Sequence, residues 1–319
     1  MRIACISASQ IPSGTANSLQ AMKACQALAQ LGHTVRLLAP GAPQQAEWAL
    51  LAQHYGLRTP FEVTWLCARP HWKRYDFSLA AVQQAGDWGA DLLYVWPLQA
   101  ALAGLLADRS RPVLLEMHGP AEGRIGPLLL RWFMRLRGRR RLLPITRALA
   151  DMLSQQVGRD FAPGESVLSP NGVDLERFRQ LPTPEEARLM LALPAGLTAG
   201  YTGHLYSGRG MGLLEQLAQR FPRVNFLWVG GRPEDVAAWQ IRLKAQGLQN
   251  VTLVGFIKNQ RLPLYQAAAD VLLMPYERAI AGSSGGNSAA YASPMKMFEY
   301  MACRRPILSS DLPVVWEVI

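Results

Sequence analysis

Residues 293–303 combine residue types that could bind a phosphate group and a sugar diol. Ser293 suits the N-cap of a helix and Pro294 its first position, which predicts a short helix through residue 303. Free amide groups and a partial positive charge at such a helix start favour phosphate. Glu299 lies one turn after Lys296, where its carboxylate could accept two hydrogen bonds from a vicinal diol such as ribose. The alternative is an ordinary amphipathic helix with an exposed glutamate, and the residue types alone leave both interpretations open.

A glycine-rich loop offers a second candidate for phosphate binding. A short expected strand begins at Ala199 and runs into the loop Gly203-His204-Leu205-Tyr206-Ser207-Gly208-Arg209-Gly210, with a helix expected from about Met211. Glycines let a backbone approach phosphate closely, and Arg209 could neutralise a departing diphosphate. The alternative for Arg209 is a plain surface arginine.

In the first half of the chain, polar residues follow two expected strands. His118-Gly119 comes where the strand 113–117 ends, at the edge where open α/β sheets place their ligands. A lone histidine is more often packed or solvated than functional. The loop after the first strand contains Ser13-Gly14 and lacks the G-x-G-x-x-G spacing of a dinucleotide site, so a tight turn is the alternative there.

Residues 124–143 form a strongly basic stretch with seven arginines and no acid among apolar and aromatic residues. Such a mixture suits a helix at an anionic membrane surface. A helix packed on the first domain with a solvated basic face is the alternative. RNA is disfavoured, because the arginines do not alternate with stacking aromatics, and we expect no nucleic-acid partner. The residues expected at the membrane are Arg131, Trp132, Arg135, Arg137, Arg139, Arg140 and Arg141.

These candidates are carried by alternating strand and helix patterns. Residues 2–9, 19–31 and 33–38 read as strand, helix and strand, which predicts the start of a parallel sheet. Further strands are expected at 63–66, 92–95 and 113–117, and a second series begins at residue 199. The fold class is therefore α/β, with two Rossmann-like domains at 1–180 and 199–319 and a linker at 181–198.

Composition sets broad limits on this interpretation. The chain has 319 residues, half of them hydrophobic, and its formal net charge is +10. The charge implies attraction to a membrane, a nucleic acid or a phosphorylated substrate. Four scattered cysteines indicate free thiols in a reducing cytosol. No apolar run suits a membrane span and no signal-peptide pattern opens the chain, so we expect a cytoplasmic protein, with peripheral attachment to the inner face of the membrane as a further expectation.

The wording of several motifs resembles the GT-B glycosyltransferases of family 4, the large retaining type. The resemblance is most specific in residues 199–210 and 291–313. It implies that the loop at Gly203 carries a basic pair, with His204 at the first position and Arg209 at the second. Tyr291 stands where the family often has a second carboxylate. The donor-binding residues that the resemblance implies are Ser13, Gly14, Gly203, His204, Gly255, Phe256, Ile257, Tyr291, Ser293, Met295, Lys296 and Glu299.

The same resemblance implies transfer of a sugar from a nucleotide-sugar to a glycan or lipid-linked acceptor, with retention at the anomeric carbon. His118, Arg209 and Glu299 are then the expected catalytic residues: His118 contacts the sugar or acceptor, Arg209 stabilises the leaving diphosphate, and Glu299 holds the ribose. No D-x-D run occurs, so we expect neither a metal nor another cofactor. The alternatives are a nucleotide-sugar epimerase of the same fold and a non-catalytic nucleotide-sugar-binding protein.

Two expectations concern the end of the chain. Residues 283–288 read as a flexible connection whose position before the donor helix fits a segment that orders over a bound sugar. The family normally continues past this chain's last residue, so the second domain is expected to be truncated.

Overall fold

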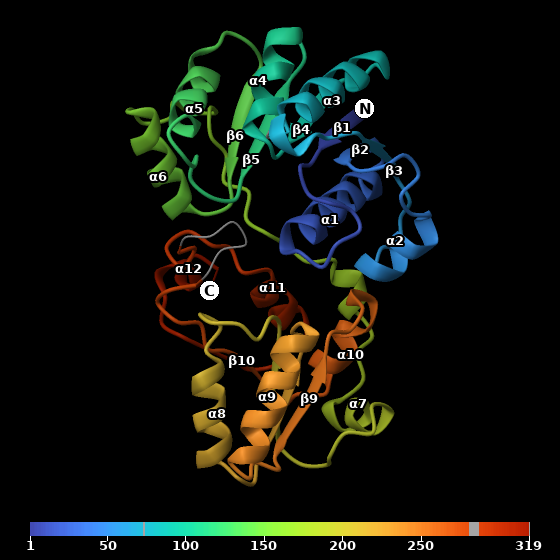
Figure 1. Ribbon diagram of the computed structural model, residues 1–319, viewed down its shortest axis with the longest axis vertical. Coiled ribbons are helices and arrows are strands. Elements are labelled where there is room, and N and C mark those ends of the chain that lie inside the picture. Colours follow the sequence, from blue (N-terminus) through green and yellow to red (C-terminus); the bar gives the residue numbers. More distant parts are fainter. Residues whose placement is uncertain (73, 281–286, 319) are drawn as a thin grey trace. The chain divides into compact units, whose positions relative to one another are not determined.

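The computed structural model describes residues 1–72, 74–280 and 287–318 (Figure 1). Most of the segment expected to order over a bound sugar, and residue 319, lie outside the described residues. The chain divides into two compact units, Met1–Pro170 and Asn171–Ile319. No described helix combines the length and apolarity that crossing a bilayer requires.

The first unit contains a six-stranded parallel sheet in the order β3-β2-β1-β4-β5-β6. Its strands are β1 (Arg2–Ile6), β2 (Thr34–Pro40), β3 (Glu62–Leu66), β4 (Leu92–Val95), β5 (Val113–Met117) and β6 (Arg140–Pro144). Its α-helices are α1 (Ala16–Gln30), α2 (Trp48–Tyr55), α3 (Tyr75–Asp87), α4 (Leu98–Ala107), α5 (Gly126–Arg135) and α6 (Arg147–Val157), with the short 3₁₀ helix η1 (Pro70–Trp72).

Both faces of this sheet are buried. Ile3 and Cys5 of β1 pack with Met22 of α1 and Leu51 of α2 in one cluster. Ala4 and Ile6, the β1 residues between and after these two, point to the opposite face and are also fully buried. Helix α3 also contacts β1. Parallel strands covered on both faces read as continuous apolar runs, which is why the sequence pattern identifies them.

The second unit contains a five-stranded parallel sheet in the order β11-β10-β7-β8-β9. Its strands are β7 (Thr198–Thr202), β8 (Asn225–Val229), β9 (Val251–Gly255), β10 (Val271–Met274) and β11 (Ile307–Ser309). Its helices are η2 (Leu175–Phe178), α7 (Pro184–Met190), α8 (Met211–Arg220), α9 (Pro233–Ala245), η3 (Asn259–Arg261), α10 (Leu262–Ala267), α11 (Met295–Ala302) and α12 (Pro313–Trp316).

The boundary between the units differs from the expected one. The structure assigns residues 171–198 to the second unit, whereas we expected the first domain to reach 180 and a linker to follow at 181–198. Phe178 belongs to the core that also holds Met297 of α11. The expected linker contains α7, which begins with a capping box at Thr183 and buries Ala187. Apolar side chains in this segment therefore pack it against the second sheet.

The basic stretch is two elements instead of one helix. Helix α5 ends at Arg135, and β6 starts at Arg140 as the edge strand beside β5. Between them Gly138 has φ +144°, a backbone conformation that side chains other than glycine's rarely adopt. Leu142 and Leu143 are buried and pair with Leu115 and Glu116 of β5, so this part of the stretch belongs to the sheet.

Candidate functional site

The loop between β7 and α8 is shaped by glycines. Gly203 has φ +145° and Gly210, the N-cap of α8, has φ +75°. A Cβ atom on Gly210 would lie 1.7 Å from the carbonyl oxygen of Pro275, so only glycine fits there. A Cβ atom on Gly203 would lie 2.6 Å from Nζ of Lys296. The two glycines therefore let this loop approach the end of β10 and the first turn of α11.

Arg209 is held by aromatic rings. Its Nη2 donates a hydrogen bond to the hydroxyl of Tyr206 over 2.8 Å, and its Cζ lies 5.1 Å from the ring centroids of both Tyr206 and Tyr276. Burial acts to lower the pKa of Arg209, but the phenols of Tyr276 and Tyr206 outweigh it and raise this pKa. Among the described residues Arg209 has no ion pair with a carboxylate, and its Nε is buried without a hydrogen-bond partner.

Lys296 places a second basic group beside the ring of Tyr276. Its Nζ lies 4.1 Å from the ring centroid of Tyr201 and 5.0 Å from that of Tyr276. This Nζ is buried and has no hydrogen-bond partner in the described part of the chain. Burial lowers the pKa of Lys296 well below its usual value, and the charge of Arg209 lowers it further, while Glu299 opposes the shift. Arg209 and Lys296 share one aromatic neighbour and form no salt bridge with a carboxylate in the described part of the chain, so the site suits an anion, whose charge would favour the protonated form of Lys296.

The start of α11 corrects one expectation. The N-cap is Pro294, one residue later than predicted, and no side chain caps the helix. Ser293 is buried and faces Asn171 instead: its Oγ accepts a hydrogen bond from the amide of Asn171 over 3.2 Å, and its carbonyl accepts one from Nδ2 over 2.5 Å. Met295, the first helical residue, is half-buried. The Asn-Gly turn of residues 171–172 thus anchors the helix start.

Glu299 is positioned by a buried amide. Its Oε2 accepts a hydrogen bond from Nε2 of Gln266 over 2.9 Å, and the same nitrogen lies 3.2 Å from the hydroxyl of Thr202. Gln266 is completely buried, so it fixes one carboxylate oxygen of Glu299 from inside the unit. No other described residue donates a hydrogen bond to the Glu299 carboxylate, which leaves Oε1 available for a ligand.

His204 adds a flat surface rather than a charge. Its ring stacks on that of Tyr206 with centroids 5.0 Å apart, and its carbonyl accepts a hydrogen bond from the hydroxyl of Tyr201. Burial lowers the pKa of His204, and the charges of Arg209 and Lys296 lower it further. The histidine is therefore neutral at pH 7, and of the predicted basic pair only Arg209 is charged.

Four more residues predicted for the donor lie elsewhere in the second unit: Gly255, Phe256, Ile257 and Tyr291. Gly255 ends β9 with φ +80°, and its carbonyl accepts a hydrogen bond from the amide of Gly230. Phe256 follows with 60% of its surface exposed, whereas Ile257 packs against the cluster around Leu227. Tyr291 lies in the turn before α11, where its amide donates to the carbonyl of Ser288.

In the first unit, the loop after β1 is fixed by α2. The amide of Ser13 donates to the hydroxyl of Tyr55 over 2.7 Å, and the ring of His54 contacts the carbonyl of Ser13 at 3.1 Å. A Cβ atom on Gly14 would meet nothing within 4 Å. Packing therefore does not require a glycine at this position, and the space beside it is open.

His118 has a partner that the sequence analysis overlooked. Its Nε2 lies 2.5 Å from Oε1 of Glu116, a carboxylate on β5 with only 2% of its surface exposed. Trp96 and Tyr94 also donate hydrogen bonds to Glu116. A single acid within the apolar run Val113–Met117 was the signal that could have found it, because burying a carboxylate requires partners.

The arginines of the basic stretch separate into exposed and structural ones. Arg135, Arg137, Arg139 and Arg141 are exposed, as is Trp132. Arg131 is half-buried, and its Nε donates to the carbonyl of Gln156 over 2.7 Å.

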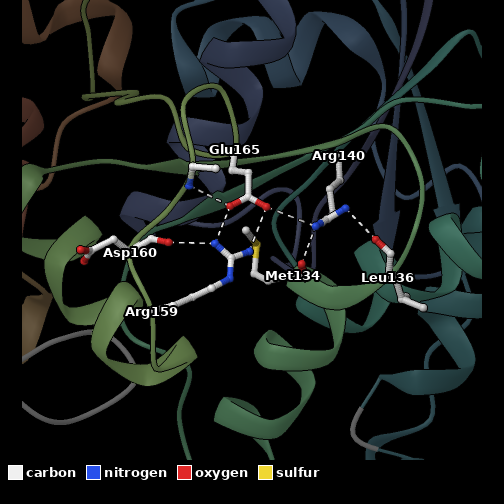
Figure 2. A network of polar contacts seen from close by, with 7 residues as sticks. Met134, Leu136, Arg140, Arg159, Asp160 and Glu165 are labelled. Carbon is white, nitrogen blue, oxygen red and sulfur yellow. Dashed lines mark hydrogen bonds and ion pairs between the residues drawn. The ribbon is translucent and has the colours of Figure 1, made fainter.

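Arg140, which was expected at a membrane surface, belongs instead to an internal polar network (Figure 2). It donates to the carbonyls of Met134 and Leu136 at the end of α5 and lies 3.4 Å from Glu165. Arg159 donates twice to Glu165 and lowers the pKa of that carboxyl to about 2. Arg140 therefore fastens the end of α5 to the segment after α6.

Two parallel-sheet α/β units, one with the basic side chains Arg209 and Lys296 beside a glycine-rich loop, are features common in proteins that bind nucleotides. Comparison with protein families makes the class specific. The model of Glycosyltransferase Family 4 matches residues 19–177, and that of Glycosyl transferases group 1 matches residues 198–319. The chain belongs to the GT-B glycosyltransferases of this family 4-like type.

Individual relatives agree with this class. TuaH of Bacillus subtilis (strain 168), a glycosyltransferase assigned to teichuronic acid biosynthesis, is 27% identical over 170 residues, which are 51% of this chain and 39% of TuaH. The alpha-galactosylglucosyldiacylglycerol synthase of Streptococcus pneumoniae (strain ATCC BAA-255 / R6) is 26% identical over 45% of this chain and 37% of its own length. The matched stretch thus spans well under half of each relative.

Among solved structures, HepE of Anabaena in complex with UDP has the same fold. It superposes with a TM-score of 0.69 at 20% identity, covering 100% of this chain and 83% of HepE. The expected GT-B architecture of two Rossmann-like parallel sheets is thereby confirmed.

Proposed function

We propose that this chain transfers a sugar from a nucleotide-sugar donor to an acceptor. The observation that carries the proposal is the pair Arg209 and Lys296, which share Tyr276 and form no salt bridge with a carboxylate among the described residues. Keeping two cations partly buried without a counter-ion is costly unless a ligand supplies the negative charge. A diphosphate leaving group has the charge and size to do so.

In the proposed mechanism the protein stabilises charge as it develops. When the bond between the sugar and the diphosphate breaks, Arg209, Lys296 and the uncapped amides of α11 stabilise the departing diphosphate. Glu299, held by Gln266, accepts hydrogen bonds from the ribose. We assign His118 to a hydroxyl of the transferred sugar or the acceptor. Retention of the anomeric configuration is part of the proposal, and no metal is required because the two cations supply the charge.

The donor and acceptor are proposed by likeness to the relatives. The complex of HepE with UDP favours a uridine nucleotide for the donor. The names of TuaH and of the pneumococcal synthase favour a glycan or a lipid-linked acceptor, respectively.

We also propose that α5 attaches the protein to an anionic membrane surface on the cytoplasmic side. Ile125, Leu128 and Trp132 are all exposed and follow the i, i+3, i+7 spacing of one helix face. The exposed arginines that follow, from Arg135 to Arg141, would lie among anionic headgroups.

The test of the transfer reaction is product analysis with the full chain. The protein is incubated with UDP-glucose, UDP-galactose, GDP-mannose or ADP-glucose, each with oligosaccharides or with vesicles containing diacylglycerol glycolipids. A glycosylated acceptor with the donor's anomeric configuration by NMR coupling constants is the expected product. A nucleotide-linked epimer without acceptor would instead establish the epimerase, and binding without any product would establish a nucleotide-sugar sensor.

A further inference from the structure

Glu116 is a buried carboxylate that no part of the proposed mechanism has yet used. It lies on β5 with 2% of its surface exposed. Its Oε1 accepts a hydrogen bond from Nε1 of Trp96 over 2.8 Å and lies 2.5 Å from Nε2 of His118. Its Oε2 accepts one from the hydroxyl of Tyr94. Three side chains thus converge on one acid near the C-terminal end of β5, an interior strand of the sheet.

The carboxylate is ionised in this setting. Burial acts to raise the pKa of Glu116, but the hydrogen bonds from His118, Tyr94 and Trp96 act in the opposite direction, and this pKa lies below its usual value. Burial and the nearby carboxylate raise the pKa of Tyr94, so this phenol stays neutral and donates. The rings of Tyr94 and Trp96 meet edge to face, with centroids 5.0 Å apart, and form a rigid support for the acid.

This geometry determines what His118 can offer to a ligand. An ionised carboxylate only accepts hydrogen bonds, so Nε2 of His118 must carry a hydrogen. The other ring nitrogen, Nδ1, has no partner among the described residues, and 23% of the side chain is exposed. In the neutral ring Nδ1 is then an acceptor, ready for a substrate hydroxyl.

We propose that Glu116 is a positioning residue: it holds His118 in the tautomer protonated at Nε2, with Nδ1 free to accept a hydrogen bond from a hydroxyl of the sugar or the acceptor. This inference rests on the proposed function for the identity of the ligand. The tautomer itself is a property of the protein without ligand.

The test combines NMR and kinetics on the full chain. Two-bond ¹H–¹⁵N spectra of histidine-labelled protein report which ring nitrogen carries the hydrogen, and His118→Asn assigns the signal among the five histidines. In the wild-type protein we expect hydrogen at Nε2 only. Glu116→Gln keeps the shape of the side chain but removes its charge, and its amide can donate as well as accept, so the fixed tautomer is expected to be lost.

Kinetics then separate positioning from structural support. Glu116→Gln should lower kcat about 10- to 100-fold, the effect of removing the partner that orients a metal-bound histidine, with the donor's KM unchanged. Tyr94→Phe is the matched control: it removes another hydrogen bond to the same carboxylate but should keep the tautomer and most of kcat.

Two results would overturn the proposal. One is a wild-type His118 protonated at Nδ1 or averaged between tautomers, which is decisive even if Glu116→Gln does not fold. The other is an equal loss of kcat in Glu116→Gln and Tyr94→Phe with the tautomer intact in both. A wild-type protein with the expected tautomer but no transfer activity would contradict the proposed function and leave the role of Glu116 in orienting the ring supported.

Discussion

At the scale of single residues, Lys296 illustrates a conflict between stability and binding. Its ammonium group is buried against Tyr201 and Tyr276 and has no hydrogen-bond partner among the described residues. Natural proteins often keep such unfavourable groups where they bind ligands. The free protein is therefore less stable than it could be, and an anion would relieve the cost.

Lys296→Met should raise the melting temperature of the free protein while abolishing nucleotide binding. The pKa of Lys296 is lowered in the folded state, so between that value and 10.5 the unfolded chain binds more protons than the folded one. The wild-type stability contributed by this group then rises with pH across the window. The variant's melting temperature should therefore exceed that of the wild type most at the acid end of this window, and the difference should vanish towards pH 10.5. Each kcal/mol of unfolding free energy corresponds to about 2–4 °C in melting temperature.

Thermal melts at several pH values measure this directly. Lys244→Met, at an exposed position of α9, is the control and should leave the melting temperature and its pH dependence unchanged. A Lys296 variant less stable than the wild type would contradict this account, because the contacts with Tyr201 and Tyr276 would then outweigh the cost of burial.

Arg209→Ala should slow transfer without unfolding the protein. The guanidinium is expected to stabilise charge that appears only as the diphosphate departs, so kcat should fall about 100- to 1,000-fold. Steady-state kinetics check this, with Arg220→Ala at the exposed end of α8 as the control. Wild-type turnover in the Arg209 variant would remove this residue from the mechanism.

At the scale of elements, α11 depends on a residue from a distant turn. Asn171→Ala leaves the carbonyl of Ser293 without its buried hydrogen bond, which should cost about 1–3 kcal/mol and weaken donor binding. Thermal unfolding and nucleotide titration measure the two effects. Ser293→Ala is the control: it keeps the hydrogen bond to the carbonyl of residue 293 and should cost less stability. An Asn171 variant as stable as the wild type would contradict the role of Asn171.

Helix α5 gives a prediction about membranes. Replacing Arg135, Arg139 and Arg141 by Gln should weaken binding to vesicles containing anionic lipid by about two orders of magnitude, at roughly 1 kcal/mol for each charge. Cosedimentation at low and high salt measures it. Replacing Arg220, Arg223 and Lys244 by Gln removes the same charge from exposed positions of the second unit. An equal loss in both variants would mean that net charge, and not the arginines at the end of α5 and after it, drives binding.

Sequence patterns predicted the elements better than their partners. The strands were readable because both faces of each sheet are covered, so the apolar runs are continuous. The sequence could not predict that Arg209 and Lys296 lie beside the same tyrosine. That contact depends on the position of Tyr276 after β10, which only the fold determines. Asn171 and Gln266 were missed as partners for the same reason: each acts on a residue that is distant in sequence and lies on another element. Glu116 is different, because it lies two residues before His118 and its acid within an apolar run was visible in the sequence.

At the scale of the whole molecule, the net charge and the fold give different information about ligands. The net charge of +10 indicates anionic partners, while the two parallel sheets indicate where ligands bind. The expected linker shows that a sequence pattern can misplace a domain boundary. Residues 181–198 look like a connection because of their prolines, yet a capped helix there packs into the second unit.

The most direct test of the central claim is a thermal-shift titration of the full chain with UDP, GDP, ADP and the matching monophosphates. A ligand that binds only the folded state stabilises it by about 2.7 kcal/mol at 100 times its Kd. We predict a clear shift with one nucleoside diphosphate, a smaller one with its monophosphate, and loss of the shift in both Arg209→Ala and Lys296→Met. No shift with any diphosphate, or an undiminished shift in both variants, would contradict the assignment of these two cations to the donor.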